Sequence, residues 1–153
     1  MSALKDRLRA DLNASLKARD SLRTAVIRMA LTAISNAEVA GTTARELSDE
    51  DVISVLSSEA KKRREAAAAF DDGGRPELAE KERAEAEILA DYLPAQLSAE
   101  EIAAIIDEAI EQTGAAGEGM KAMGKVMGLV QSKTKGRADG AAVAAEVKRR
   151  LGA

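Results

Sequence analysis

The chain has 153 residues, of which 46% are hydrophobic, and it carries a formal net charge of -3 with no cysteine and no histidine. That composition excludes disulfides, thiol nucleophiles and imidazole bases, and with them most zinc and haem sites. Apolar stretches stay far below the roughly 20 residues of a membrane span, and the charged N-terminal segment has no apolar core of signal-peptide length. We therefore expect a cytoplasmic protein with no membrane association. Phe70 and Tyr92 are the only aromatic residues, so the core must be aliphatic and rich in alanine, which favours closely packed helices.

Two helices are expected at the start of the chain. Leucine recurs at every fourth position from Leu4 to Leu16, which predicts a first amphipathic helix. Asp20 can cap a second helix, which Gly41 terminates. The apolar stripe of this second helix is expected to consist of Leu22, Val26, Met29, Ala33 and Ile34.

A third and a fourth helix follow. Ser48 with Asp51 three residues later is a capping-box pattern at the start of the third. After the DDGGR turn (71–75), Pro76 suits the first position of the fourth helix, and Pro94 ends it. The apolar side of the third helix is expected to carry Val52, Leu56, Ala60, Ala67 and Phe70.

Charged runs on these two helices allow two interpretations. The run KKRR (61–64) is either a solvated face, in which Glu59 pairs with Arg63, or a basic patch for RNA or a partner protein. Arg63 falls on the apolar stripe, so we expect its stem to lie there with the charged head in water. The glutamates between residues 77 and 87 could hold magnesium or act as acids and bases, but their alternation with basic residues favours a solvated face.

The last part of the chain predicts three more helices. PAQL (94–97) is the expected linker, and Ser98 with Glu101 forms a second capping box at the start of the fifth helix. That helix has the strongest helical periodicity in the chain. KGRADG (135–140) is a tight loop, and Asp139 can cap the last helix. The sixth helix, between them, is marked by Met120, Met123, Met127 and Val130.

No strand pattern and no internal repeat is visible, so the predicted fold class is all-α. We expect an N-terminal helical bundle of about four helices over residues 1–97 and a small three-helix domain over residues 98–153. Charge is uneven between them, because residues 118–153 hold all 8 basic residues of the second domain against three acidic ones, a net charge of +5. The last third is therefore a basic module on an acidic protein.

Two glycines interrupt the sixth predicted helix. Gly124 and Gly128 each cost about 1 kcal/mol relative to alanine in a helix interior, so something should offset them. Glycine on such a face allows either tight packing against a neighbouring helix or the approach of a phosphate backbone. In a continuous helix, one face would carry Lys121, Lys125, Gly128, Ser132 and Lys135.

The loop and helix that follow also carry basic residues. Gly136 permits an unusual backbone angle, and Lys135 and Arg137 stand beside a helix N-terminus, which favours anions. Asp139 works against this, because its carboxylate would fill that site as the cap. Basic residues 148–150 either complement the helix dipole at the C-terminal end or extend the basic surface.

Several runs resemble the GatB/YqeY family, and specifically the free-standing YqeY-like proteins. They occur in the family's order, cover nearly the whole chain, and are specific together although none is diagnostic alone. The runs are VIRMALTAISNAE (26–38), EAKKRREAAAAFDDGGRPELAEKERAE (59–85), YLPAQLS (92–98), MGKVMG (123–128) and KGRADG (135–140).

The resemblance implies an N-terminal helical domain and a three-helix domain similar to the tail of the B subunit of the tRNA-dependent amidotransferase. In that enzyme the tail grips tRNA while other domains do the chemistry, and residues 123–128 and 135–140 match it. The family is also associated with glutamine-dependent carbon–nitrogen ligation on aminoacyl-tRNA, an activity of the whole amidotransferase. This chain has no Gly-rich ATP loop and no recognisable amidase nucleophile constellation.

We therefore expect a tRNA-binding accessory module associated with tRNA aminoacylation or amidation, with no catalysis of its own and no cofactor or metal. Two alternatives remain open: a component of a glutamine-dependent amidotransferase and a protein–protein adaptor. Expected partners are tRNA or other structured RNA, and an aminoacyl-tRNA synthetase or amidotransferase. Two aromatic residues are too few for base stacking, which favours recognition of shape and phosphates. The expected RNA-binding residues are Lys121, Gly124, Lys125, Gly128, Lys133, Lys135, Arg137, Lys148 and Arg149.

Overall fold

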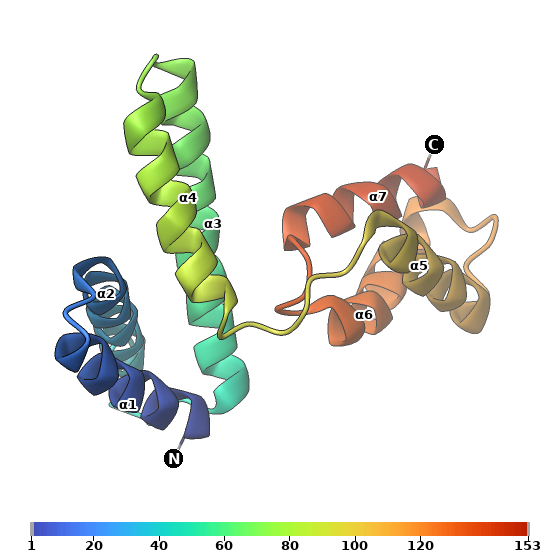
Figure 1. The fold of residues 1–153 in the computed structure, drawn as a ribbon. Helices are drawn as coiled ribbons and strands as arrows, with labels where there is room; N and C mark the ends of the chain where they lie inside the picture. The colour runs from blue at the N-terminus through green and yellow to red at the C-terminus, as the bar shows by residue number, and fades with distance from the viewer. Residues whose placement is uncertain (1, 153) are drawn as a thin grey trace. The chain divides into compact units, whose positions relative to one another are not determined.

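The computed structural model describes residues 2–152, and over these residues every regular element is helical, which confirms the predicted all-α class. The chain divides into two compact units, Met1–Leu93 and Pro94–Ala153. Helices α1 to α4 belong to the first unit and α5 to α7 to the second (Figure 1), and each unit is described by itself. Within the described residues, no helix is long and apolar enough to cross a membrane.

Helices α1 (Ala3–Lys17) and α2 (Ser21–Glu38) pack against each other at the start of the first unit. The predicted cap of α2 is confirmed, because the Asp20 carboxylate accepts a hydrogen bond from the Arg23 backbone N–H at 3.0 Å. Ser2 caps α1 in the same way. Each cap satisfies one of the donors that a helix N-terminus leaves unpaired.

Helices α3 (Asp49–Asp72) and α4 (Pro76–Ala90) form an antiparallel hairpin, which Figure 1 shows extending beyond α1 and α2. The capping box at Ser48 and Asp51 is confirmed: the Ser48 side chain accepts from Asp51 N–H at 3.1 Å, and the Asp51 carboxylate accepts from Ser48 N–H at 3.2 Å. Pro76 occupies the start of α4, as predicted.

One aliphatic cluster joins these four helices, but the sequence misplaced part of α2. Met29, expected in the core, is 48% exposed, whereas Ile27 and Ala30 are buried. The buried stripe of α2 is thus rotated by a fraction of a turn relative to the stripe predicted from the sequence, because α2 packs against neighbouring helices on two sides. The cluster consists of Leu8, Val26, Ile27, Ala30, Ile34, Leu47, Val52, Leu56, Ala60, Ile88, Leu89 and Tyr92.

Arg63 is buried with its charge, so the expectation that its head reaches water is wrong. It is 7% exposed, and its Nε lies 3.3 Å from Oε2 of Glu85, which is 9% exposed. Arg63 shares the inner face of α3 with Ala60 and Ala67, whose small side chains leave room for the guanidinium. The expected Glu59–Arg63 pair is also wrong, since Glu59 pairs with Lys62. Glu85 likewise departs from the solvated face expected for the acidic run.

The second unit packs α5 (Ala99–Thr113), the 3-10 turn η1 (Gly119–Ala122), α6 (Met123–Thr134) and α7 (Gly140–Gly152). The capping box at Ser98 and Glu101 is confirmed, with both hydrogen bonds at 3.1 Å. Gly114 ends α5 in the left-handed conformation, φ 65°. The core consists of Ile106, Ala109, Ala115, Ala122, Val126, Val130, Val143 and Val147.

Candidate nucleic-acid interface

Helix α6 buries one side in the second unit and exposes the other. Val126, Val130 and Thr134 are buried at helical spacing, with Met123 and Met127 packed against the same core. The opposite side is exposed, and its residues are Gly124, Lys125, Gly128, Gln131 and Ser132. We call these five residues the glycine face of α6.

Both glycines of this face look onto open space. A Cβ added at Gly124 or at Gly128 would meet no heavy atom within 4 Å. The interpretation that they allow tight packing against a neighbouring helix is therefore wrong within the described residues. Each glycine weakens the helix by about 0.5–1 kcal/mol relative to alanine. Because the space beside both glycines is open, no packing contact within the described part of the unit offsets that loss.

The continuous lysine face predicted from the sequence is shorter than expected at both ends. Lys121 lies in η1, and α6 starts only at Met123. Lys135 follows the last residue of α6 with an extended backbone, φ -57° and ψ 124°. Of the five residues expected on one face, Lys125, Gly128 and Ser132 are within α6. Lys121 and Lys135 extend the basic surface from the segments on either side.

Three of the predicted basic residues form surface ion pairs. Lys125 Nζ lies 2.8 Å from Glu118 Oε2, and Lys133 Nζ lies 3.6 Å from Glu108 Oε2. Arg149 donates to Glu146, with nitrogen–oxygen distances of 2.6 and 2.9 Å, and this contact lowers the pKa of the Glu146 carboxyl. Lys133 lies about 140° around the helix from Gly128 and is directed at α5, away from the glycine face.

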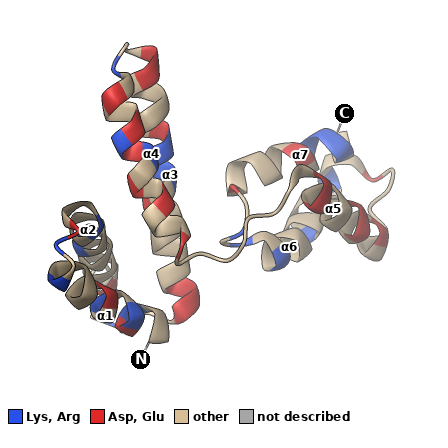
Figure 2. Cartoon of the chain, viewed as in Figure 1, with Lys and Arg blue, Asp and Glu red and all other residues tan. Residues whose placement is uncertain are grey.

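Three other predicted residues keep an unbalanced charge. Lys121, Lys135 and Lys148 are exposed and form no ion pair with residues 2–152. Figure 2 shows where the opposite charge lies: α5 carries acidic residues and no basic ones, whereas basic residues mark α6 and the end of α7. The second unit thus has an acidic helix and a basic surface on other elements.

The loop of residues 135–140 is held by the segment that precedes α5. Leu97 N–H donates to the Arg137 carbonyl at 2.8 Å, and Gln96 Nε2 donates to the Gly136 carbonyl at 3.3 Å. Arg137 Nε donates to the Ala95 carbonyl at 3.5 Å. Gly136 has φ 77°, which its lack of a side chain allows. The positioning roles of Gln96 and Leu97 were missed, since no local pattern reveals contacts 40 residues apart.

The N-terminus of α7 has an internal anion. Asp139 accepts a hydrogen bond from the Ala141 backbone N–H at 3.2 Å, which confirms it as the cap. Its carboxylate occupies the position that a phosphate would need at this helix start. Phosphate contacts near this loop would therefore involve the side chains of Lys135 and Arg137 and not the helix dipole.

The predicted basic residues lie toward the two ends of α6. At one end, η1 with Lys121 packs against the last turn of α7, where a Cβ on Gly152 would lie 3.0 Å from Met120 Sδ. Lys125 lies in the first turn of α6 at this end, and Lys148 lies just before the last turn of α7. The loop with Lys135 and Arg137 is at the other end, about 18 Å away along the 12 residues of α6. The glycine face lies between the two basic ends.

A family comparison matches residues 5–151 with the model for YqeY-like proteins. The match covers nearly the whole chain, and the chain therefore belongs to the YqeY-like protein family. A search of curated proteins finds no match.

Proposed function

We propose that this protein is a cytoplasmic tRNA-binding accessory module that acts beside an aminoacyl-tRNA synthetase or an amidotransferase and has no catalysis of its own. The observation that carries the proposal is the exposed glycine face of α6 between two basic ends. Gly124 and Gly128 weaken α6 without any packing gain inside the unit. Lys121 and Lys135 leave positive charge unbalanced on either side of them.

The geometry suits a phosphate backbone better than exposed bases. Glycines let a partner backbone come close to the helix, and flanking lysines neutralise phosphates wherever they lie along it. The second unit has no aromatic side chain for stacking. We therefore infer recognition of the shape and phosphates of folded RNA, with little dependence on sequence. The resemblance of residues 123–128 and 135–140 to the amidotransferase tail supports tRNA as that RNA.

We also propose that the two units are separate domains, with RNA binding in the second. The second unit starts at Pro94, and a new capping box begins α5 at Ser98. Limited proteolysis of the full chain should cut first between residues 91 and 96. Early cleavage inside α5 or α6 would contradict independent folding of the second unit.

Salt-dependent tRNA binding tests the RNA proposal, with a matched pair of lysines as its control. If about four phosphates are contacted, log K should fall against log salt with a slope near -3. Lys125 and Lys133 sit on the same helix with side chains 45% exposed, but only Lys125 belongs to the glycine face. Lys125→Ala should weaken binding to all tRNAs about equally and make the salt slope shallower by roughly one. Lys133→Ala should change both the affinity and the salt slope less.

Gly128→Leu tests the glycine face directly. The site is open, so the variant should keep its helical circular dichroism and melt at or above the wild-type temperature, yet bind tRNA at least tenfold more weakly. A folded variant with full tRNA affinity would contradict the proposed interface. Glutaminase or aminoacyl-tRNA hydrolase activity of the purified wild-type chain would contradict the non-catalytic part of the proposal and favour the amidotransferase alternative.

A further inference from the structure

An acidic side chain lies beside each of the two basic ends of α6. Glu118 Oε2 lies 2.8 Å from Lys125 Nζ at the end that includes η1. Asp139 lies at the other end, directly before the first residue of α7. An anion that the chain itself holds opposes the approach of a phosphate to the same cation. The effect of these two carboxylates on anion binding therefore depends on how firmly each is held.

The two carboxylates are held in different ways. Asp139 accepts a hydrogen bond from the Ala141 backbone N–H at 3.2 Å, so it cannot leave without removing the cap of α7. Glu118 makes no such contact, since η1 starts without a side-chain cap. The Glu118 and Lys125 side chains are 46% and 45% exposed, and exposed ion pairs of this kind contribute little to stability. Glu118 can therefore leave its lysine at low cost, whereas Asp139 is fixed.

The loop before η1 presents Glu118 to the start of α6. Gly117 and Gly119, on either side of Glu118, have φ values of 81° and 66°, a conformation that glycine adopts without strain. The Glu118 backbone N–H donates at 3.0 Å to the carbonyl of Ala115, which is fully buried. The backbone is thus anchored beside the glutamate, and release of Lys125 requires only rotation of the Glu118 side chain.

We propose that Glu118 competes with the phosphates of a bound polyanion for Lys125 and turns to solvent when the polyanion binds. The identity of that polyanion as RNA rests on the function proposed above. A polyanion held at Lys121 and Lys135 brings further phosphates to Lys125 at a high effective concentration, so it displaces Glu118 more readily than a single phosphate does. The exchange of one anion for another keeps the binding weak and reversible.

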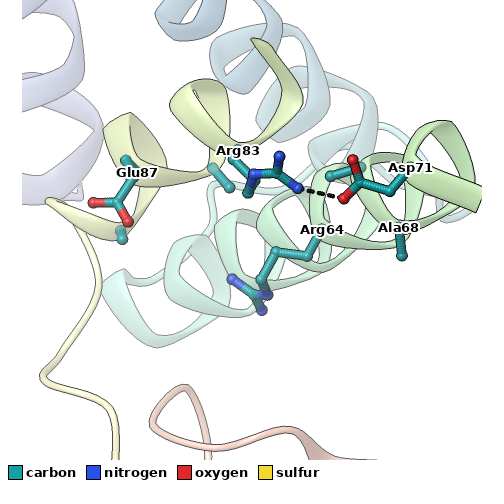
Figure 3. Close-up of a pocket in the computed structure, with 8 residues that line it drawn as sticks. Arg64, Ala68, Asp71, Arg83 and Glu87 are labelled. Atoms are coloured by element: carbon teal, nitrogen blue, oxygen red, sulfur yellow. Dashed lines mark hydrogen bonds and ion pairs between the residues drawn. The ribbon is translucent and has the colours of Figure 1, made fainter. Parts of the chain in front are cut away.

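An ion pair of similar geometry lies in the groove between α3 and α4 (Figure 3). Arg83 Nη1 lies 2.7 Å from Asp71 Oδ2, and the two side chains are 49% and 45% exposed. That groove is electrically balanced, because two basic and two acidic side chains line it. Glu118, by contrast, lies three residues before Lys121, which is exposed and forms no ion pair with residues 2–152. The Asp71 pair is therefore a control of equal exposure outside the proposed RNA-binding surface.

Removal of single carboxylates from the full chain tests the proposal. At about 0.1 M salt, Glu118→Gln should bind tRNA about three- to fivefold more tightly than the wild type, because no ion pair has to be broken. The salt slope should become steeper by up to about one. Asp71→Asn and Glu108→Gln add the same charge away from the glycine face, and each should change the affinity by less than about 1.5-fold. Equal gains in all three variants would show a general charge effect and overturn the proposal.

A double-mutant cycle shows whether Glu118 acts through Lys125. In the Lys125→Ala background, Glu118→Gln should no longer raise the affinity for tRNA, since the cation for which the two anions compete is absent. A gain that persists in that background would mean that Glu118 repels RNA independently of Lys125, and the proposal would be wrong. Circular dichroism and the melting temperature should match the wild type for Glu118→Gln, because the pair is exposed.

Heparin separates this proposal from the proposed function, because it is a polyanion without bases or phosphates. On a heparin column, Glu118→Gln should elute at higher salt than the wild type, and later than Asp71→Asn and Glu108→Gln. Salt-dependent tRNA binding with no gain from Glu118→Gln would overturn the role of Glu118 and leave the proposed function intact. If the wild type binds no tRNA, the proposed function fails, and the heparin comparison alone decides the role of Glu118: later elution of Glu118→Gln supports it, and unchanged elution overturns it.

Discussion

Replacing Gly128 by alanine should stabilise the second unit. The position is interior to α6, its backbone has an ordinary helical φ, and a Cβ there meets nothing within 4 Å. The added methyl therefore creates no strain, and the unfolded chain loses conformational freedom. The expected gain is about 0.5–1 kcal/mol, which raises the melting temperature of a unit of this size by about 2–8 °C.

Gly114→Ala is the matched control for that prediction. Gly114 also has nothing within 4 Å of an added Cβ, but its φ is 65°. The same methyl group should destabilise the unit there by about 1–2 kcal/mol, because a non-glycine residue is strained in the left-handed region. Space is equal at both sites, so only the backbone conformation can produce opposite signs.

Differential scanning calorimetry of the full chain at constant pH and concentration gives both shifts. A Gly128→Ala protein that melts at or below the wild-type temperature would refute the description of this face as open helix. Greater stability together with weaker tRNA binding would show that the chain keeps glycine for function at the expense of helix stability.

Three further outcomes are expected. Glu85→Ala should destabilise the first unit by about 3 kcal/mol, measured by denaturant unfolding, because Arg63 would stay buried without its partner; a change below about 1 kcal/mol would contradict this. Burial and the hydrogen bond to Asp11 raise the pKa of Tyr92 above its ordinary value. The contribution of this raised pKa to stability should therefore be full below about pH 10 and be lost as the pH rises further. The absorbance of this single tyrosine reports its titration, and Tyr92→Phe should remove that part of the pH dependence of stability. Hydrogen bonds from Ser98, that of its backbone N–H first, lower the pKa of the Glu101 carboxyl, so helical signal should be lost on acidification through about pH 4; Glu101→Gln should weaken this loss, and an unchanged acid transition would contradict it.

Helix starts were predictable from the sequence because capping is local. Asp20, Ser48 and Ser98 each accept a hydrogen bond from a backbone N–H three residues further along the chain. The sequence spacing alone therefore identifies both partners of the capping hydrogen bond. The α-helical part of the sixth helix was less predictable at its start. Residues 119–122 form a 3-10 turn, whose hydrophobic spacing is too similar to an α-helix to separate by pattern.

Burial around each helix was harder to predict than helix position. Met29 and Arg63 both lie on stripes that a helical wheel places inward, yet one is exposed and the other is buried with a charged partner. Which side of a helix is covered depends on the neighbours it meets in three dimensions. The open surroundings of Gly124 and Gly128 are of the same kind, since the sequence allowed close packing and open surface equally.

The hydrogen bonds between residues 95–97 and the loop of residues 136–137 bear on how the second unit, the proposed RNA-binding part, could be isolated. A fragment that starts at Ser98 keeps every helix of the second unit but removes the donor of Leu97 and the side chain of Gln96. The loop that carries Lys135 and Arg137 would then lose its anchor while the helical content stayed the same. A fragment that starts at Pro94 keeps the anchor, so four residues outside every helix decide whether a truncated protein presents this loop in its native shape.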